Sequence, residues 1–481
     1  MYYQFIVSFV VYLMIVLAIG IISSRSTHDS YQPESQSTDF LLGGRSTHWF
    51  LTALSAHAAD MSDWLFMGLP AAVFLQGAYQ AWIPIGLLVG MFFAWHGIAA
   101  RLRRSSEQYG GLTLASYFKN RFHDTSGIIV TICALISFFF FAVYLSVGLK
   151  GIGYVLKSAF QIDYHIGIFL AVIVVVTYTV LGGFISVAWI DLFQGLFLLS
   201  MLMFVPIYAF FNSGGIAAII KGAQLRGVSL SLIPDYSLRG ILSIILNPFA
   251  WALGYFGMPH ILTKFMGSAN ADHMHKAKYV GITWQLCATF SAVAVGLVGL
   301  AYFSGDIPGK PEFIFIEMTK GLFNPWFAGI VLCAILAATI STVDSQLLVL
   351  ASIVAQDFYK NLLNKQATSR QVLKIYRGAL IGAALTGFFI AWNEESTIMA
   401  LVKYAWSGLG SSFGPLIILS LYSNKINKYG AIVGILTGAV VSATWDLINP
   451  YITTLPIYSI VPGFVSGLLV IYCVSIIMSK R

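Results

Sequence analysis

Charged residues are scarce in this sequence. Asp, Glu, Lys and Arg make up 10% of its 481 residues, whereas a soluble protein carries about 25%, because it must cover its surface with groups that water solvates. Apolar types reach 58% of the chain. This balance excludes a soluble enzyme, a disordered chain and a disulfide-stabilised secreted domain, and it predicts an integral membrane protein.

Cysteines and the motifs of enzyme chemistry are equally sparse. The four cysteines lie singly inside apolar runs with no CxxC spacing, so we interpret them as small buried residues rather than metal ligands. The sequence has no nucleophile–base pair, metal motif or phosphate loop at membrane depth, and we therefore expect no enzyme activity. The net charge of +8 lies in short basic runs between apolar segments, which indicates contact with membrane lipid and no nucleic-acid partner.

Long apolar runs dominate the rest of the chain. A hydrocarbon core about 30 Å thick needs about 20 apolar residues per helix, and this window predicts thirteen transmembrane helices joined by short loops. They are placed at 4–23, 47–73, 78–100, 127–149, 164–181, 185–211, 240–263, 280–303, 325–355, 376–393, 397–421, 430–447 and 456–478. The longest polar stretches between them are 24–46, 101–126, 213–238, 304–324 and 357–375.

The basic residues predict the orientation in the membrane. If the N-terminus lies outside, most Lys and Arg residues fall in loops on the cytoplasmic side, as the positive-inside rule requires. An odd number of spans then places the C-terminus in the cytoplasm. The first apolar run has no basic residue before it and no small-residue cleavage site, so we expect a retained span and not a signal peptide.

Four aspartates lie inside these predicted spans, where a charge is costly: Asp60, Asp63, Asp191 and Asp344. Lys403 is the one basic residue placed clearly within a span, and one lysine cannot neutralise four carboxylates. Ionisable groups at membrane depth mark ion or substrate pathways. We therefore expect a cation from solution to supply the missing counter-charge.

Two spans contain residues that interrupt a transmembrane helix. Residues 55–71 mix Ser, Ala, His, Asp and Gly before Pro70 is reached, and residues 251–262 hold two glycines and a proline beside Trp251 and Tyr255. Breaks of this kind point backbone groups into a cavity. The second and seventh spans are five apart, which is the spacing of two inverted five-helix repeats. We therefore expect the substrate site where the two breaks meet.

The ninth span carries a polar face. Ala338, Ser341, Thr342 and Ser345 share that face at about 100° per residue, and Asp344 flanks it. Taken alone, the hydroxyl groups could bond back to their own helix. With a carboxylate beside them, they form the oxygen-rich surface that a hard cation prefers.

Five segments that carry these features resemble a known family: SAHAADMSDWLFMGLPA, LGGFISVAWIDLFQG, WALGYFGMPHILTKFM, FNPWFAGIVLCAILAATISTVDSQLL and VKYAWSGLGSSFGPLI. In this order, over essentially the whole chain, they are similar to the solute:sodium symporters, and most similar to the bacterial proline-transporting members. The resemblance implies an all-α membrane protein with a leucine-transporter-type core of two inverted five-helix repeats at 47–421. It adds one helix at 4–23 and two helices at 430–478, within a single transmembrane domain covering 1–481.

The resemblance also implies which residues form the site. A principal Na⁺ site would use carbonyl groups and hydroxyls of Ala58, Met61, Ala338, Ser341 and Thr342. A second Na⁺ position, present in some members, would lie near Asp191, Asp344 and Ser345. The substrate would lie among Asp60, Ser62, Asp63, Trp64, Tyr144, Trp251, Tyr255, Met258 and Pro259.

The function that the resemblance implies is secondary active symport in a bacterial inner membrane. Na⁺ is the expected coupling ion and L-proline the expected substrate. Two residues depart from the pattern of proline symporters, since Asp63 stands where glycine is usual and Met258 stands where glutamine is usual. Another amino acid, a carboxylate or a sugar carried by the same fold therefore stays open as an alternative, as does a channel or sensor built on the transporter scaffold.

Overall fold

The computed structural model describes residues 2–28, 42–179, 184–303, 305, 307 and 309–479. Within these ranges the regular structure is helical, apart from one isolated bridge between Thr47 and Ser268. The elements follow one another as α1 (Tyr2–His28), η1 (Gly43–Arg45), α3 (Trp49–Ala58), η2 (Asp63–Leu65), α4 (Gly68–Gln76), η3 (Ala78–Ala81), α5 (Trp82–Phe93), η4 (Ala94–Ala99), α6 (Ala100–Gln108), α7 (Leu114–Arg121), α8 (Ile128–Phe160), α9 (Tyr164–Thr179), α10 (Phe184–Asn212), α11 (Gly215–Arg226), α12 (Leu238–Leu246), η5 (Phe249–Phe256), α13 (Pro259–Met266), η6 (Ala271–His273), α14 (Met274–Tyr302), η7 (Pro311–Phe313), α15 (Ile314–Leu322), α16 (Pro325–Ser352), η8 (Ile353–Leu363), α17 (Ser369–Ala391), α18 (Ile398–Tyr422), α19 (Lys428–Ile452) and α20 (Ile460–Ser479).

Ten helical segments of the described chain are long and apolar enough to cross a membrane, and two shorter apolar helices, Asp63–Gln76 and Tyr164–Thr177, accompany them. Apolar runs adopt helices in lipid because a helix satisfies its own backbone groups. The prediction of an all-α, multi-pass membrane protein is thereby confirmed. Each of the thirteen predicted ranges overlaps a helix, but the number thirteen itself stays a prediction.

Several helices run beyond their predicted ends. The helix α8 continues to Phe160, and α17 begins at Ser369, because polar caps rather than the edge of an apolar run stop a helix. Thr368 and Gln371 form such a cap at α17, where each side chain bonds to the backbone of the other. The predicted stretch 24–46 and the end of the predicted span 164–181 lie partly outside the described residues.

The polar stretches also hold helices that the sequence reading left as loops. The stretch 101–126 contains α7 and most of α6, 213–238 contains α11, and 304–324 contains α15. In α7, Thr113 and Ser116 form a capping box. In α7 a local cap therefore starts a short helix without any long apolar run, whereas α6, α11 and α15 have no side-chain cap at their first turn.

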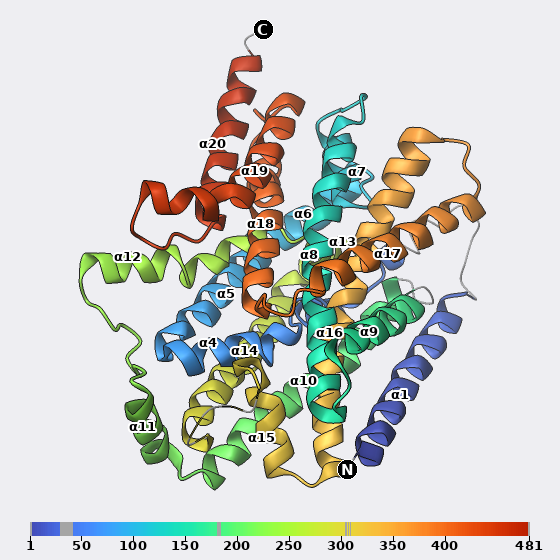
Figure 1. Ribbon diagram of the computed structural model, residues 1–481. Coiled ribbons are helices and arrows are strands. Elements are labelled where there is room, and N and C mark those ends of the chain that lie inside the picture. Colours follow the sequence, from blue (N-terminus) through green and yellow to red (C-terminus); the bar gives the residue numbers. More distant parts are fainter. Residues whose placement is uncertain are drawn as a thin grey trace.

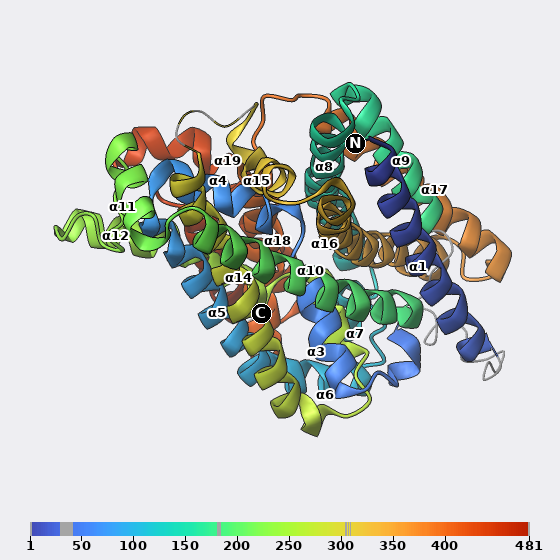
Figure 2. The same ribbon diagram turned by 90° about the horizontal axis from the view of Figure 1, so that it is seen from below.

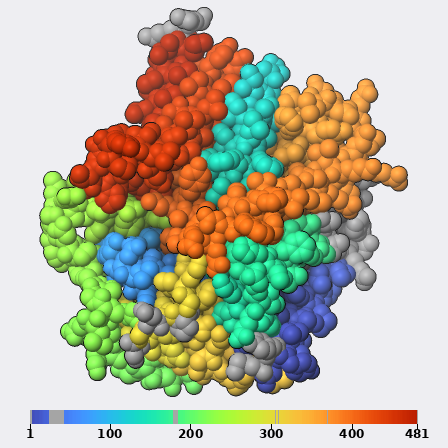
Figure 3. All heavy atoms as spheres, viewed as in Figure 1, coloured from blue at the N-terminus to red at the C-terminus, as the bar shows by residue number. Residues whose placement is uncertain are grey.

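The two termini lie at opposite ends of the molecule, as Figure 1 shows. Near the N-terminus, the rings of Phe5 and Phe9 contact Phe160 at the end of α8, with ring centroids 6.0 and 5.3 Å apart. Near the C-terminus, the Asn427 side chain donates to the carbonyl of Ser475 in α20 at 2.9 Å. In the space-filling view, α19 and α20 appear in red at the end opposite the blue helix α1 (Figure 3).

The helices α8 and α16 form the middle of the structure. Seen from the end that carries the N-terminus, they lie side by side, with α1 and α9 outside them and α14 and α5 on the other side of the molecule (Figure 2). Nearly the whole of α16 from Val331 to Ser352 is buried. Its polar face therefore points into protein and not into lipid.

Close packing holds the second interrupted segment, η5, against α18. A Cβ atom added at Gly254 would lie 1.9 Å from Nε1 of Trp406, and one added at Gly257 would lie 2.5 Å from the backbone nitrogen of Gly414. Small residues allow two backbones in a membrane protein to approach this closely. The position of η5 is thus fixed by glycines on both sides of the contact.

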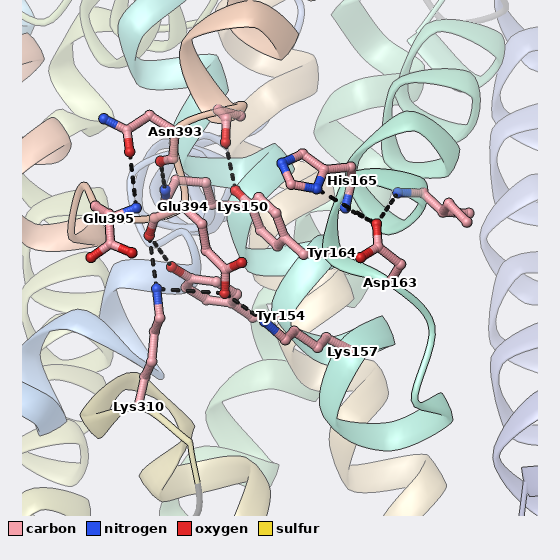
Figure 4. A network of polar contacts seen from close by, with 12 residues as sticks. Lys150, Tyr154, Lys157, Asp163, Tyr164, His165, Lys310, Asn393, Glu394 and Glu395 are labelled. Atoms are coloured by element: carbon pink, nitrogen blue, oxygen red, sulfur yellow. Dashed lines mark hydrogen bonds and ion pairs between the residues drawn. The ribbon is translucent and has the colours of Figure 1, made fainter.

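Polar contacts join α8, the segment before η7 and the connection between α17 and α18 (Figure 4). The carboxylate of Glu394, between α17 and α18, lies 2.6 Å from Nζ of Lys157 and 3.5 Å from Nζ of Lys310. Burial alone would raise the pKa of Glu394, but hydrogen bonds and the charges of the two lysines outweigh it, so this pKa lies below its usual value. Lys150, expected in a loop, is instead buried in α8 and donates to the carbonyl of Asn393 at 2.6 Å.

Candidate functional site

The second predicted span is broken in the middle, as its sequence suggested. The helix α3 ends at Ala58, and the backbone amides of Asp60 and Met61 both reach back to the carbonyl of His57 at 3.2 Å. Ser62 is then extended, with φ −82° and ψ −165°, before η2 begins. Carbonyl groups at the end of a helix have no partner further along it, so this break presents backbone oxygens inside the protein.

The seventh predicted span is broken in a related way. The 3-10 helix η5 ends at Phe256, and Met258 adopts an extended conformation with φ −77° and ψ 108°. Pro259 then begins α13, a position where its missing N–H costs nothing because the first amides of a helix lack partners anyway. Both discontinuous helices inferred from the sequence are therefore present.

Side chains join the two breaks. The hydroxyl of Tyr255, in η5, donates to Oδ2 of Asp60 at 2.5 Å, and Nε2 of Gln285 donates to the Tyr255 hydroxyl at 2.9 Å. The indole of Trp64 donates to the Asp60 carbonyl at 3.1 Å. Gln285 lies on α14 and was not identified from the sequence; its one signal was an amide in an apolar span. Asp60 is thus held by groups from both interrupted segments.

Oxygen atoms of α16 face the first break. The hydroxyl of Ser341 donates to the carbonyl of Ala58 at 3.0 Å and to that of Ala338 at 3.1 Å. Thr342, one residue on, is buried, and its hydroxyl has no hydrogen-bond partner among the described residues. Met61 is buried within the break. The Ser341 hydroxyl therefore lies beside the carbonyl groups of Ala58 and Ala338. The family resemblance implies these three residues for one Na⁺ site, and oxygen donors of this kind suit a hard cation.

Aromatic rings cover the other side of the Asp60–Tyr255 contact. Trp406 of α18 donates to the carbonyl of Trp251 at 3.0 Å, and its ring meets Tyr255 edge-on at 5.1 Å. Tyr144 of α8 lies edge-on to His260, with centroids 6.2 Å apart. The sequence reading missed Trp406, because α18 showed no break to draw attention to it, and it also missed His260.

The two residues that depart from the proline-symporter pattern are both buried. A Cβ atom at Gly151 would lie 2.0 Å from a carboxylate oxygen of Asp63, so this carboxylate packs directly against α8. Met258 is fully buried at the second break. Both residues therefore lie beside a break, Asp63 directly after the extended Ser62 and Met258 at the second break itself.

The assumption that the buried aspartates lack basic partners is wrong for Asp191. Lys264 lies in α13, where the sequence reading had placed it beyond the end of a span, and its Nζ is 2.8 Å from Oδ2 of Asp191. The hydroxyl of Ser55 donates to the same oxygen at 2.6 Å. A helix that continues past its apolar run brings the lysine inside. Asp344 and Ser345 are buried on α16.

The family follows from comparison with known proteins. The profile of the sodium:solute symporter family matches residues 40–438. The chain belongs to this family. As a member of it, the protein is a membrane transporter, and its family and relatives are not enzymes.

Among relatives of this symporter, the high-affinity proline transporter PutP of Bacillus subtilis (strain 168) is 38% identical over 93% of this chain and 94% of its own. The sodium/proline symporter of Escherichia coli (strain K12) is 37% identical over 96% of this chain and 91% of its own. The osmoregulated proline transporter OpuE of B. subtilis is 36% identical over 99% and 95%.

Solved structures place the fold of this symporter among those of Na⁺-coupled transporters. A Na⁺-coupled sialic acid symporter, solved in a substrate-bound outward-open state, aligns over 98% of both chains with a TM-score of 0.81 at 18% sequence identity. The nucleobase-cation-symport-1 transporter Mhp1, in a closed conformation, aligns over 91% of this chain and 93% of its own with a TM-score of 0.51 at 15% identity. The expected leucine-transporter-type fold is confirmed.

The centre of the symporter is closed in this structure. The exposed fraction is 1% for Asp60, 0% for Tyr255, 3% for Trp64 and 4% for Trp251. A small solute could therefore reach the junction of the two breaks only after helices move apart, which is the behaviour of alternating access around a fixed site.

Proposed function

We propose that this protein is a Na⁺-coupled symporter that imports L-proline. The observation that carries the proposal is the contact between the two interrupted helices, in which Tyr255 bonds to Asp60 beside the oxygens of Ala58, Ala338 and Ser341. Relatives named as proline transporters share 36–38% of their residues with this chain over most of its length, which supports proline as the substrate.

Na⁺ would bind between the first break and α16. Its ligands would be the carbonyl groups of Ala58, Met61 and Ala338 and the hydroxyls of Ser341 and Thr342. In this structure the Ser341 hydroxyl donates to the Ala58 carbonyl. A Na⁺ ion bound there would replace this hydrogen bond, and both oxygen atoms would coordinate the ion. A cation there would fix the end of α3.

Proline would bind where the two breaks meet. The proposed pocket contains Asp60, Ser62, Asp63, Trp64, Tyr144, Trp251, Tyr255, Met258 and Pro259. Na⁺ and proline then order the same backbone segment, because Ala58 and Asp60 lie two residues apart. Each ligand should raise the affinity for the other by the same factor.

The orientation in the bacterial inner membrane is part of the proposal, with the N-terminus outside and the C-terminus in the cytoplasm. Arg121, Lys425 and Lys428 line one pocket beside residues of the last helix, so basic groups gather at the end of the molecule that carries the C-terminus. At the other end, Lys157 and Lys320 are paired with glutamates. An excess of Lys and Arg residues favours the cytoplasmic side. A reporter enzyme that is active only in the cytoplasm, fused after residue 481, tests this assignment.

Uptake into proteoliposomes tests the function. With the purified protein, an inward Na⁺ gradient should drive accumulation of labelled proline above equilibrium, and collapse of the gradient should abolish it. Asp60→Asn should lose most of this Na⁺-driven uptake. A panel of unlabelled amino acids, carboxylates and sugars should compete less well than proline. If another solute competes better, Asp63 and Met258 are the first residues to exchange, for Gly and Gln.

A further inference from the structure

A buried ion pair links α10 and α13 away from the Asp60–Tyr255 junction. Nζ of Lys264 lies 2.8 Å from Oδ2 of Asp191, and the exposed fractions of the two side chains are 3% and 1%. The hydroxyl of Ser55, in α3, donates to the same carboxylate oxygen at 2.6 Å. One oxygen of Asp191 is thus held by groups from two other helices.

The lysine is fixed in place by more than this one contact. Its Nζ lies 5.2 Å from the ring centroid of Phe184, at the start of α10, which is within reach of a cation–π contact. Phe184 in turn packs at the end of α13, because a Cβ atom at Gly267 would lie 2.5 Å from its ring. The ammonium group is therefore enclosed by protein on the side away from the carboxylate.

This geometry bears on the Na⁺ position that the family resemblance suggests near Asp191. A buried carboxylate needs a counter-charge, and here a covalently attached ammonium supplies it. A Na⁺ ion at Oδ2 would have to displace Lys264. The other oxygen, Oδ1, is buried and has no hydrogen-bond partner among the described residues, but a Na⁺ ion there would share the single negative charge of Asp191 with Lys264. The two cations would repel each other in an interior that screens charge poorly. The donor set does not fit a free cation while Lys264 is present.

We propose that Lys264 acts as a built-in cation at Asp191, so that the protein binds a single Na⁺, at the site between Ala58 and Ser341. This inference deepens the proposed function by assigning its ion stoichiometry, and it rests on Na⁺ coupling but not on proline as the substrate. Because α13 directly follows the second break, the charge that neutralises Asp191 belongs to a helix of the transport core and does not leave with the cargo.

The test is equilibrium binding of ²²Na⁺ to the purified full-length protein. The wild-type protein should bind one Na⁺. Lys264→Gln should bind two. Lys264→Arg, which keeps the charge, should bind one, and so should the double variant Asp191→Asn/Lys264→Gln, in which neither charge is present.

Two results would overturn the proposal: two Na⁺ ions bound to the wild-type protein, or one bound to a folded Lys264→Gln variant. The wild-type measurement needs no variant, so the proposal is testable even if Lys264→Gln does not fold, and a thermal melt in detergent reports that case. The binding assay does not require transport. A wild-type protein that binds one Na⁺ but takes up no proline would refute the substrate assignment and leave the role of Lys264 standing.

Discussion

Replacement of Tyr255 by phenylalanine should weaken substrate binding without a change of shape. The Tyr255 hydroxyl donates to Asp60 at 2.5 Å and accepts a hydrogen bond from Gln285 at 2.9 Å. Tyr255→Phe removes both contacts and leaves the carboxylate and the amide without this partner in a closed interior. The ring itself, which packs edge-on against Trp406, stays in place.

The size of the effect follows from the loss of a hydrogen bond to a charged group, which is worth about 1.5–3 kcal/mol. Since a tenfold change in an equilibrium constant corresponds to about 1.4 kcal/mol, the proline concentration for half-maximal uptake should rise about 10- to 100-fold. The assay is Na⁺-driven uptake of labelled proline into proteoliposomes over a range of proline concentrations.

Tyr164→Phe is the matched control. The Tyr164 hydroxyl is also buried, and it donates to the carbonyl of Ala391 at 2.6 Å, at the contact between α9 and α17. Its loss should lower the melting temperature but leave the half-saturating proline concentration within about twofold of wild type. Equal proline affinities in Tyr255→Phe and wild type, or equal losses in both variants, would refute the role given to the Asp60–Tyr255 contact.

Three further changes probe other parts of the structure. Thr342→Ala should raise the Na⁺ concentration for half-maximal uptake more than it changes substrate selectivity; altered selectivity at unchanged Na⁺ dependence would move this residue to the substrate pocket. Gly254→Val should lower the melting temperature and the yield of folded protein, since even a Cβ atom there would lie 1.9 Å from Trp406; a stable variant would contradict the close packing of η5 on α18. The pKa of Glu394 lies below its usual value of 4.5, so the ionised side chain stabilises the folded state at pH values above 4.5, and this stability should be lost as the pH falls through the lowered pKa. Glu394→Gln should therefore flatten the acidic part of a plot of melting temperature against pH. An unchanged plot would argue against the ion pairs with Lys157 and Lys310.

The sequence predicted the features that depend on local chemistry. Glycine, proline and small residues disfavour a continuous helix wherever they fall, so both breaks could be placed within a few residues of Ser62 and Met258. The polar face of α16 was visible for the same reason, since a helical period brings Ser341 and Ala338 to one side.

Features that depend on tertiary packing could not be predicted from the sequence. Gln285 of α14 and Trp406 of α18 lie in helices without a break, and only the fold brings the amide and the indole ring to Tyr255. The Lys264–Asp191 pair was missed because hydropathy ends a span at the first charged residue, whereas α13 continues until its backbone is capped at Gly267. From the sequence alone, four carboxylates within the spans had no identified basic partner. The structure shows that one of them, Asp191, is paired with Lys264.

The closed centre of the molecule has a kinetic consequence. Because the residues around Asp60 are buried, solute can reach or leave the site only when the helices open, so each transport cycle includes an opening step. If the compartment that receives the solute already contains substrate, the protein can bind a new substrate molecule there and return to its starting state loaded rather than empty. Exchange of labelled for unlabelled solute should then outpace net uptake whenever the return of the empty protein is the slowest step in the cycle.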